Sequence, residues 1–87
     1  MLFINNVMKY KRVKDLREDT DMNQTQFAKI LGMSQTGYSK YETGENDIPT
    51  SILIKMADYY ETSIDYILGR TDEKTPYPPS KDFKQNT

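Results

Sequence analysis

The sequence of 87 residues contains no cysteine and no histidine. These absences exclude disulfide bonds and thiol catalysis, and they remove the side chains that hold most zinc ions in proteins. The commonest general base is missing as well. No glycine-rich phosphate loop and no group of carboxylates at metal-ligand spacing takes their place. The sequence therefore predicts a protein that is not an enzyme and that needs no metal or cofactor.

Long hydrophobic runs are also lacking. No stretch approaches the roughly 20 apolar residues that a membrane-spanning helix requires. The apolar opening, residues 1–4, stops at Asn5 and has neither the basic start nor the small-residue cleavage site of a signal peptide. With 36% hydrophobic and 29% charged residues, the chain suits one small globular domain. We expect a cytoplasmic protein without a membrane segment.

Neither sign of charge dominates, because the formal net charge is −1. The charges are unevenly distributed: residues 1–43 carry seven Lys/Arg and five Asp/Glu, whereas residues 44–87 carry five and eight. Five basic residues lie close together, opposed there only by Asp15: Lys9, Lys11, Arg12, Lys14 and Arg17. Such a cluster is either a solvated helix face or a surface for nucleic acid. The low net charge predicts weak non-specific DNA binding, since that affinity depends on the phosphates neutralised.

The apolar periodicity predicts an all-α protein, because no segment shows a convincing strand-like alternation. Five helices are expected, over residues 9–19, 24–31, 35–43, 49–60 and 63–68. Apolar residues at helical spacing are expected to face the core: Tyr10, Val13, Leu16, Phe27, Ile30, Leu31, Leu53, Met56, Ala57, Tyr60, Ile64, Ile67 and Leu68. Pro49 is expected in the first turn of the fourth helix, where its missing N–H is harmless.

Three segments follow from this pattern: an N-terminal arm, a helical domain, and a disordered or extended C-terminal tail, over residues 1–8, 9–69 and 70–87. The tail is not expected to be helical, because its three prolines forbid a continuous helix. Met8 directly precedes the first helix, which leads to the hypothesis that translation begins there and that residues 1–7 are a weakly ordered extension. Tyr77 and Phe83 could anchor the tail to a neighbour.

The stretch from Asn23 to Gly44 has the pattern of a helix-turn-helix. Asn23 is a good N-cap, and Gln26 three residues later is placed for a capping box. Gly32 suits a left-handed helix end, and Ser34 is the expected N-cap of the next helix. The close crossing of the two helices is expected to be packed by Phe27, Ala28, Leu31, Met33 and Tyr38.

The run NQTQFAKILGMSQTGYSKYETGENDIP, followed by ILIKMADYYETSIDYILGR, resembles the phage-repressor family of Cro/CI, or XRE-type, helix-turn-helix proteins. The resemblance covers Lys9 to Arg70. It implies a five-helix, lambda-repressor-like fold in which the second and third helices form the reading unit. The third helix, residues 35–43, would lie in the major groove of an operator. The resemblance thus implies a transcriptional regulator that binds specific double-stranded DNA, most simply a repressor.

The resemblance also implies roles for individual residues. Glutamine can pair with adenine, lysine with guanine, and hydroxyl groups with several base edges; the expected base-contacting residues are Gln35, Thr36, Ser39 and Lys40. The N-terminus of the second helix favours an anion; the expected phosphate-contacting residues are Asn23, Gln24, Thr43 and Asn46. Glu45 also flanks the groove, but its carboxylate would repel a phosphate.

Three further features lie within the reading unit. Arg17 and Glu42 match positions at which the family has an ion pair between the first helix and the end of the third, so we expect them to orient the reading helix. Tyr38 and Tyr41 match inward-facing sites, which favours core packing over stacking on bases. Gly37 is unusual inside a helix, since glycine costs about 1 kcal/mol relative to alanine. Either DNA approaches the backbone closely there, or the site tolerates the weakness.

Two alternatives use the same fold: a protein-interaction module, and an antitoxin that binds both DNA and a toxin. Because one such module reads half of a site, we expect a homodimer. Its surface would be the fifth helix and the start of the tail, including Tyr66, Ile67 and Arg70, unless these residues only close the monomer core. The tail is too short for a ligand-sensing domain, so no small-molecule ligand is expected.

Overall fold

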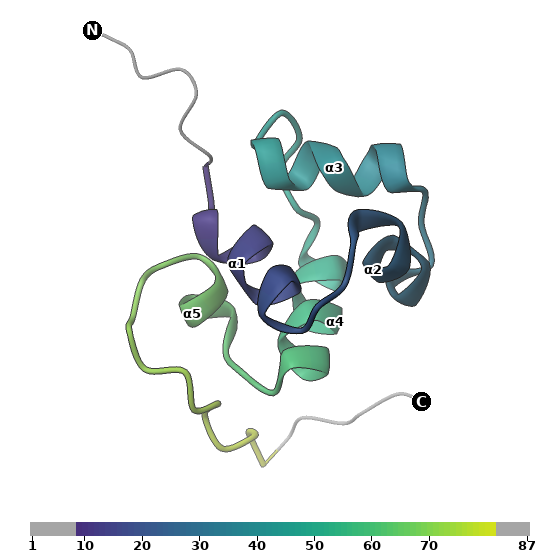
Figure 1. The fold of residues 1–87 in the computed structure, drawn as a ribbon. Coiled ribbons are helices and arrows are strands. Elements are labelled where there is room, and N and C mark those ends of the chain that lie inside the picture. Colours follow the sequence, from purple (N-terminus) through teal and green to yellow (C-terminus); the bar gives the residue numbers. More distant parts are fainter. Residues whose placement is uncertain (1–8, 82–87) are drawn as a thin grey trace, which may run out of the picture.

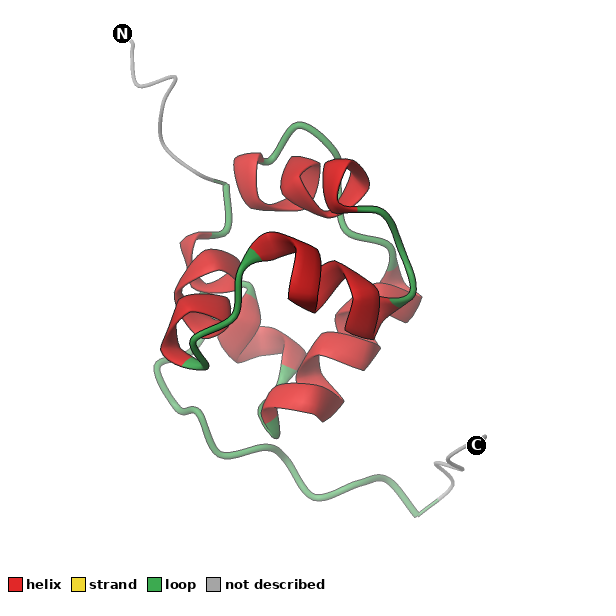
Figure 2. Cartoon of the chain, turned by 45° about the vertical axis from the view of Figure 1, so that its right-hand side comes forward, coloured by secondary structure: helices red, strands yellow, loops and turns green. Residues whose placement is uncertain are grey.

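The computed structural model describes residues 9–81, and this part of the chain is all-α, as predicted. Its helices are α1 (Lys11–Asp19), α2 (Gln24–Leu31), α3 (Gln35–Thr43), α4 (Thr50–Tyr60) and α5 (Ile64–Ile67). Figures 1 and 2 both place α3 at one end of the bundle and the non-helical segment after α5 at the opposite end. The expected arm, the start at Met8 and the anchoring role of Phe83 lie outside the described residues.

Local capping explains why α2 and α3 begin and end where the sequence predicts. The Asn23 side chain accepts a hydrogen bond from the Gln26 backbone, and the Gln26 side chain accepts one from the Asn23 backbone, which completes the capping box. Gly32 ends α2 with a φ of 76°. Such a left-handed conformation is strained for most residues but not for glycine. Ser34 accepts from Gly37 and starts α3.

The other three helices depart from the predicted bounds. α1 begins two residues late, because Lys9 and Tyr10 form a turn and Tyr10 occupies the N-cap position. Pro49 is not in the first turn of α4: its ψ of 150° is extended, so it stands just before the helix. α5 is shorter than expected at four residues, with Ser63 as its cap and a turn from Leu68 onward.

The core is formed by buried apolar side chains from all five helices and from the loop before α4: Val13, Leu16, Phe27, Ala28, Leu31, Tyr38, Tyr41, Ile48, Met56, Ala57 and Ile67. At its centre the rings of Phe27 and Tyr38 meet edge to face, with centroids 5.4 Å apart. This contact joins α2 to α3.

Ile30 corrects the predicted core, because 46% of its surface is exposed. The buried positions of α2 are Phe27, Ala28 and Leu31. At about 100° per residue, Ile30 lies about 110° away from the centre of that arc. A two-turn helix therefore buries a narrower stripe than the spacing of its apolar residues suggests.

None of the helices among residues 9–81 has the length and apolar character that a membrane-spanning helix needs.

Candidate nucleic-acid interface

The corner between α2 and α3 is held by its own backbone. The Gly32 N–H donates to the carbonyl of Lys29, and the Met33 N–H donates to the carbonyl of Ala28, each at 3.0 Å. Ala28 is 1% exposed, so its small side chain sits directly at the crossing of the helices. The direction of α3 is thus fixed at its first residue by a short turn with satisfied hydrogen bonds.

α3 has one face in the core and one toward solvent. Tyr38, Tyr41 and Glu42 are buried. On the other side, the four residues predicted to contact bases share the outward face: Gln35 and Thr36 are exposed, whereas Ser39 and Lys40 are half-buried. The hydroxyls of Ser39 and Thr43 donate to carbonyls one turn earlier, those of Thr36 and Lys40.

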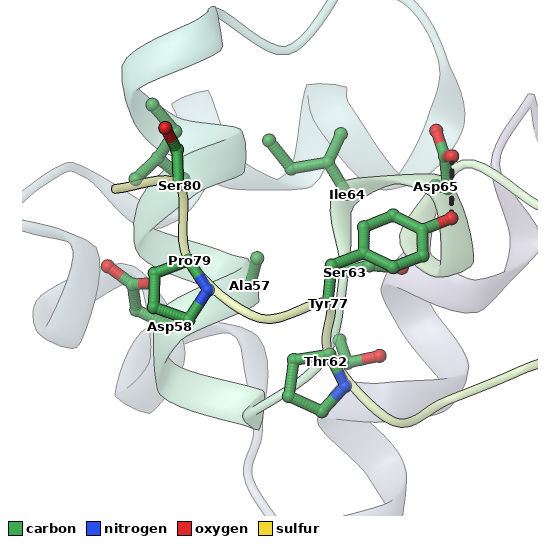
Figure 3. A pocket seen from close by; sticks show the side chains of 11 residues that line it. Ala57, Asp58, Thr62, Ser63, Ile64, Asp65, Tyr77, Pro79 and Ser80 are labelled. Carbon is green, nitrogen blue, oxygen red and sulfur yellow. Dashed lines mark hydrogen bonds between the residues drawn. The ribbon is translucent and has the colours of Figure 1, made fainter. Parts of the chain in front are cut away.

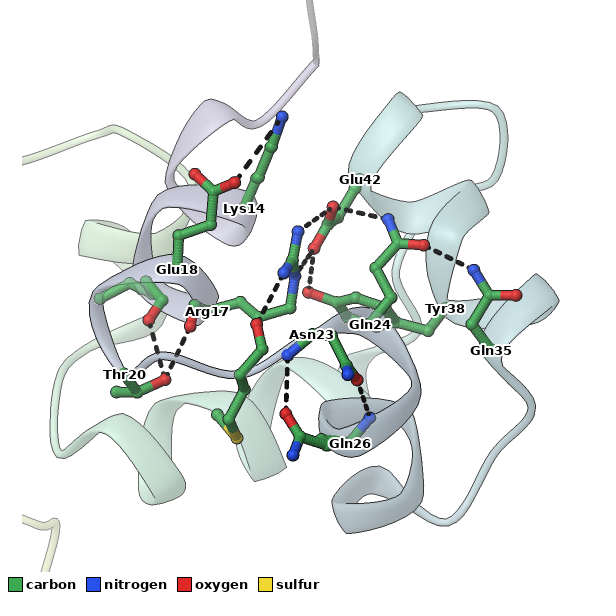
Figure 4. A network of polar contacts seen from close by, with 12 residues as sticks. Lys14, Arg17, Glu18, Thr20, Asn23, Gln24, Gln26, Gln35, Tyr38 and Glu42 are labelled. Carbon is green, nitrogen blue, oxygen red and sulfur yellow. Dashed lines mark hydrogen bonds and ion pairs between the residues drawn. The ribbon is translucent and has the colours of Figure 1, made fainter.

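A buried polar network ties α3 to α1 (Figure 4). The guanidinium of Arg17 donates to both carboxylate oxygens of Glu42, with N···O distances of 2.6 and 3.1 Å. The Tyr38 hydroxyl donates to the same carboxylate at 2.6 Å. Glu42 is 1% exposed and Arg17 7% exposed. The structure therefore brings together the two residues that the sequence pairs, in a bidentate geometry shielded from water.

Ionisation of this network follows from its contacts. Burial alone would raise the pKa of Glu42, but hydrogen bonds from Arg17, Tyr38 and Gln24 together lower it below its ordinary value. Burial raises the pKa of Tyr38 far above its ordinary value, and the hydrogen bond to Glu42 raises it further. Tyr38 is therefore a neutral donor, and Glu42 a charged acceptor, near neutral pH.

The network extends to the molecular surface through Gln24. Its side-chain amide donates to Glu42 at 2.9 Å, and its carbonyl oxygen accepts from the Gln35 side chain at 2.6 Å. Figure 4 shows the chain of contacts running from Arg17 on α1 to Gln35 at the start of α3. The bond between the two glutamines was not predicted from the sequence. The only sequence signal for this bond is a glutamine in the first position of each helix.

The residues predicted to contact phosphates differ in what their side chains already bind. Asn23 uses its side-chain oxygen to cap α2, and Gln24 is engaged with Glu42 and Gln35. Both nevertheless stand at the N-terminus of α2, where backbone N–H groups favour an anion. Thr43 and Asn46 are exposed at the far end of α3, so the four residues flank the outward face of α3 from its two ends.

The basic cluster formed by Lys9 and four residues of α1 is not an open cationic surface. Each of its five members has a carboxylate partner within 4 Å, in the pairs Lys9–Asp47, Lys11–Asp15, Arg12–Asp72, Lys14–Glu18 and Arg17–Glu42. Of the two interpretations left open by the sequence, this geometry favours a helix face that is neutralised within the protein. Lys40 on α3 forms no ion pair among the described residues, which leaves its charge available at the outward face.

Gly37 is explained by the corner. A Cβ atom there would lie 3.1 Å from the Met33 methyl group and 3.2 Å from the Ser34 hydroxyl, the group that caps α3. Both distances are tighter than ordinary packing. The sequence suggested two other reasons for this glycine. It could not indicate the steric one, because the contact with Met33 and Ser34 depends on how the turn folds back over the first residues of α3.

The fold and this corner define the class of the molecule as an all-α helix-turn-helix domain. The chain belongs to the helix-turn-helix family, since the family model described as "Helix-turn-helix" matches residues 13–67.

Similar proteins include the uncharacterized HTH-type transcriptional regulator YobD of Bacillus subtilis, 32% identical over 75 residues that cover 86% of this chain and 67% of YobD. The cryptic phage CTXphi transcriptional repressor RstR of Vibrio cholerae is 44% identical over 69 residues, which cover 76% of this chain and 62% of RstR. The antitoxin PezA of Streptococcus pneumoniae is 30% identical over 66 residues, with 76% and 42% covered. The chain thus spans from about two fifths to two thirds of these relatives.

Two solved structures share the fold. A transcriptional regulator from Listeria innocua superposes with a TM-score of 0.67 at 24% identity, over 76% of this chain and 63% of that one. The P22 c2 repressor, solved in complex with a synthetic operator, superposes with a TM-score of 0.64 at 22% identity, over 71% of this chain and 94% of the repressor chain. At these identities the likeness concerns the fold.

Proposed function

We propose that this protein is a transcriptional regulator, acting as a repressor, that binds specific double-stranded DNA by placing α3 in the major groove. The observation that carries the proposal is the hydrogen-bonded chain from the buried Arg17–Glu42 pair through Gln24 to the exposed Gln35. A side chain held from the core reads a base edge at a lower cost in conformational entropy than a free one. Such a role places the protein in the cytoplasm, with the DNA.

The outward face of α3 is chemically suited to direct readout. The Gln35 amide, in its bond to Gln24, keeps its own carbonyl oxygen and one N–H for the adenine edge, which takes one donor and one acceptor. The other proposed base contacts come from Thr36, Ser39 and Lys40. The proposed phosphate contacts come from both ends of the face, through Asn23, Gln24, Thr43 and Asn46. Glu45 is exposed beside them, and its carboxylate repels the phosphates of a DNA backbone that comes closer.

A homodimer on DNA belongs to the same proposal, because two modules on a two-fold axis match half-sites about 34 Å apart. Its surface is α5 and the start of the tail. Of the three residues proposed there, Ile67 is 1% exposed and Tyr66 lies under Arg12, so Arg70 carries most of the exposed area. Sedimentation with and without a two-site duplex tests the dimer. A complex that remains at one protein per two-site duplex contradicts it.

The DNA-binding proposal is tested by selection from a pool of random duplexes, followed by titration against the enriched sequence and a scrambled competitor. We expect enrichment of one motif. Gln35→Ala and Lys40→Ala should lose most of the preference while melting as the wild type does. Lys29→Ala is the matched control for Lys40→Ala, because Lys29 is exposed on α2, away from the outward face of α3. Absence of any enriched motif would favour a protein-interaction module.

One similarity favours a second candidate, an antitoxin that binds DNA and also a toxin. The 30% identity to PezA covers only 42% of that relative, so it concerns the helix-turn-helix part. Co-expression with the product of an adjacent gene tests this candidate. A growth defect caused by that product alone and relieved by this protein would support it.

A further inference from the structure

Arg12, near the start of α1, holds the chain that follows α5. Its guanidinium donates to the carbonyl of Tyr66 at 2.9 Å, to the carbonyl of Thr71, and to the carboxylate of Asp72 at 2.7 Å. It also stacks over the ring of Tyr66, 4.0 Å from the centroid. One side chain of α1 thus makes four contacts more than 50 residues away in sequence, two with Tyr66 of α5 and two with Thr71 and Asp72, which follow α5.

The segment that it holds, residues 70–81, is called the strap here. It is bound at separate points to α5 and to the loop between α4 and α5. The buried hydroxyl of Thr62 donates to the carbonyl of Lys74, and the Tyr77 hydroxyl donates to Asp65 at 3.0 Å. In Figure 3 the side chains of Tyr77 and Pro79 stand over this face of the bundle. The strap is therefore anchored by individual polar bonds.

Between these anchors the strap does not pack closely. A groove of about 520 Å³ remains between it and the helices, lined among others by Ile54, Ala57, Ile64 and Pro79. Every strap residue from 72 to 81 is exposed. A segment with few buried apolar contacts opens at low free energy. The strap can therefore lift from the bundle while the helices stay folded, unless Arg12 holds it.

The same end of α1 also touches the exit of α3. Lys9 pairs with Asp47 in the loop after α3. The Lys9 Cβ lies so close to Gly44, the residue that ends α3, that a Cβ atom on Gly44 would come within 2.7 Å of it. One turn further along, Arg12 reaches the strap. The turn that leads into α1 is thus in contact with the end of the reading helix, and the first turn of α1 that follows it is in contact with the strap.

We propose that Arg12 is a latch that couples the strap to the DNA-reading end of the domain. When the strap is closed, the Thr71 carbonyl and the Asp72 carboxylate add to the contacts of Arg12 with Tyr66. They fix Arg12, and with it the first turn of α1 and the Lys9–Tyr10 turn that leads into it, against which the end of α3 packs. When the strap lifts, that turn frays and α3 loses a support. Any partner that draws the strap away from α5 therefore weakens DNA binding at the opposite end of the bundle. The effect on DNA depends on the proposed function, whereas the latch itself does not.

The experiment compares Arg12→Gln with Lys11→Gln in the full chain. Each variant removes one positive charge from the same turn, so their effects on non-specific attraction to DNA are matched. Opening of the strap is measured as the rate of tryptic cleavage after Lys74, whose carbonyl is the one bound by Thr62. We expect Arg12→Gln to be cleaved at least 10-fold faster than the wild type, and Lys11→Gln within twofold of it.

Coupling is measured on the same variants as hydrogen exchange of the α1 amides and as affinity for the selected duplex. Arg12→Gln should speed exchange in the first half of α1 at least fivefold and raise the Kd three- to tenfold. Should this variant unfold, Arg12→Lys replaces it, with cleavage about threefold faster, because lysine keeps the charge but not the planar fork.

Equal cleavage rates in wild type and Arg12 variants would overturn the latch. Faster cleavage with unchanged α1 exchange would overturn the coupling. Absence of sequence preference in every variant, with the cleavage and exchange results as expected, would refute the proposed function and leave the latch standing.

Discussion

Arg12 and Arg17 lie on the same helix, five residues apart, and hold opposite ends of the molecule in different ways. Arg17 faces a carboxylate that is 1% exposed and receives donors from three side chains. Arg12 faces two backbone carbonyls and a carboxylate on a side chain that is 99% exposed. Loss of the Arg17–Glu42 contact leaves an unpaired charge in the core. Loss of the Arg12 contacts, by contrast, releases a segment that is already exposed to water. The reading corner is therefore built to stay fixed, and the strap to be releasable.

The sharpest test of this contrast is Arg17→Ala. Removing one partner of a buried, hydrogen-bonded pair costs about 3–5 kcal/mol, because the remaining charge is left without compensation. For a domain of this size the thermal midpoint should fall by more than roughly 12 °C. Lys14→Ala, which breaks only the exposed pair with Glu18, should change the midpoint little. Calorimetry or circular dichroism gives both values; similar midpoints for the two variants would contradict a structural role for the pair.

The next largest effect is expected from low pH, which should weaken the Arg17–Glu42 contact and leave the contacts of Arg12 with the two carbonyls unchanged. The pKa of Glu42 is lowered in the folded protein, so its ionised form contributes stability that is fully present above its ordinary pKa of 4.5. This contribution is lost as the pH falls below 4.5 and through the lower folded-state pKa. Urea unfolding at pH 7 and pH 3 should therefore show a larger loss of stability for the wild type than for Glu42→Gln, which cannot titrate at this position. Parallel losses would show that Glu42 does not account for the acid sensitivity.

Part of this architecture could be predicted from sequence because its causes are local. The caps at Asn23, Gly32 and Ser34 act within a few residues, so the bounds of α2 and α3 came out correctly. Pairing of Arg17 with Glu42 needed the family resemblance, since 25 residues separate them.

Other features depend on how distant segments meet. The bonds of Arg12 to the strap join residues up to 60 positions apart, and no spacing rule indicates them. The exposure of Ile30 follows from which neighbours α2 meets, not from its own periodicity. The bond between Gln24 and Gln35 likewise appears only once the corner has set the distance between two helix starts.

That bond leads to a prediction of intermediate size. Gln24→Ala removes the bridge between Glu42 and Gln35, and a side-chain hydrogen bond of this kind contributes on the order of 1 kcal/mol. We expect the affinity for the selected duplex to fall about fivefold. Thr25→Ala, its exposed neighbour, serves as the control.

A double-mutant cycle with Gln35→Ala isolates the coupling between the two glutamines. Gln24→Ala should have a smaller effect once Gln35 is already alanine, because only the proposed phosphate contact of Gln24 is then left to lose. Strictly additive losses in affinity would mean that Gln24 acts only through its phosphate contact and does not position Gln35.

The smallest expected effect is at Gly37, where two terms nearly cancel. Alanine gains about 1 kcal/mol of helix propensity over glycine. The new Cβ, however, would meet the Met33 methyl group at 3.1 Å and the capping hydroxyl of Ser34 at 3.2 Å. Met33 can turn aside, but Ser34 can move only by giving up its bond to the Gly37 N–H, and a lost cap costs about 1 kcal/mol. Gly37→Ala alone should therefore change the stability by less than about 0.5 kcal/mol. In a Ser34→Ala background, where the capping hydroxyl is already absent, the same substitution should become stabilising. If it stabilises both backgrounds equally, then Ser34 does not limit the site, and the two reasons offered by the sequence remain: close approach of DNA to the backbone, or a site that tolerates the weakness.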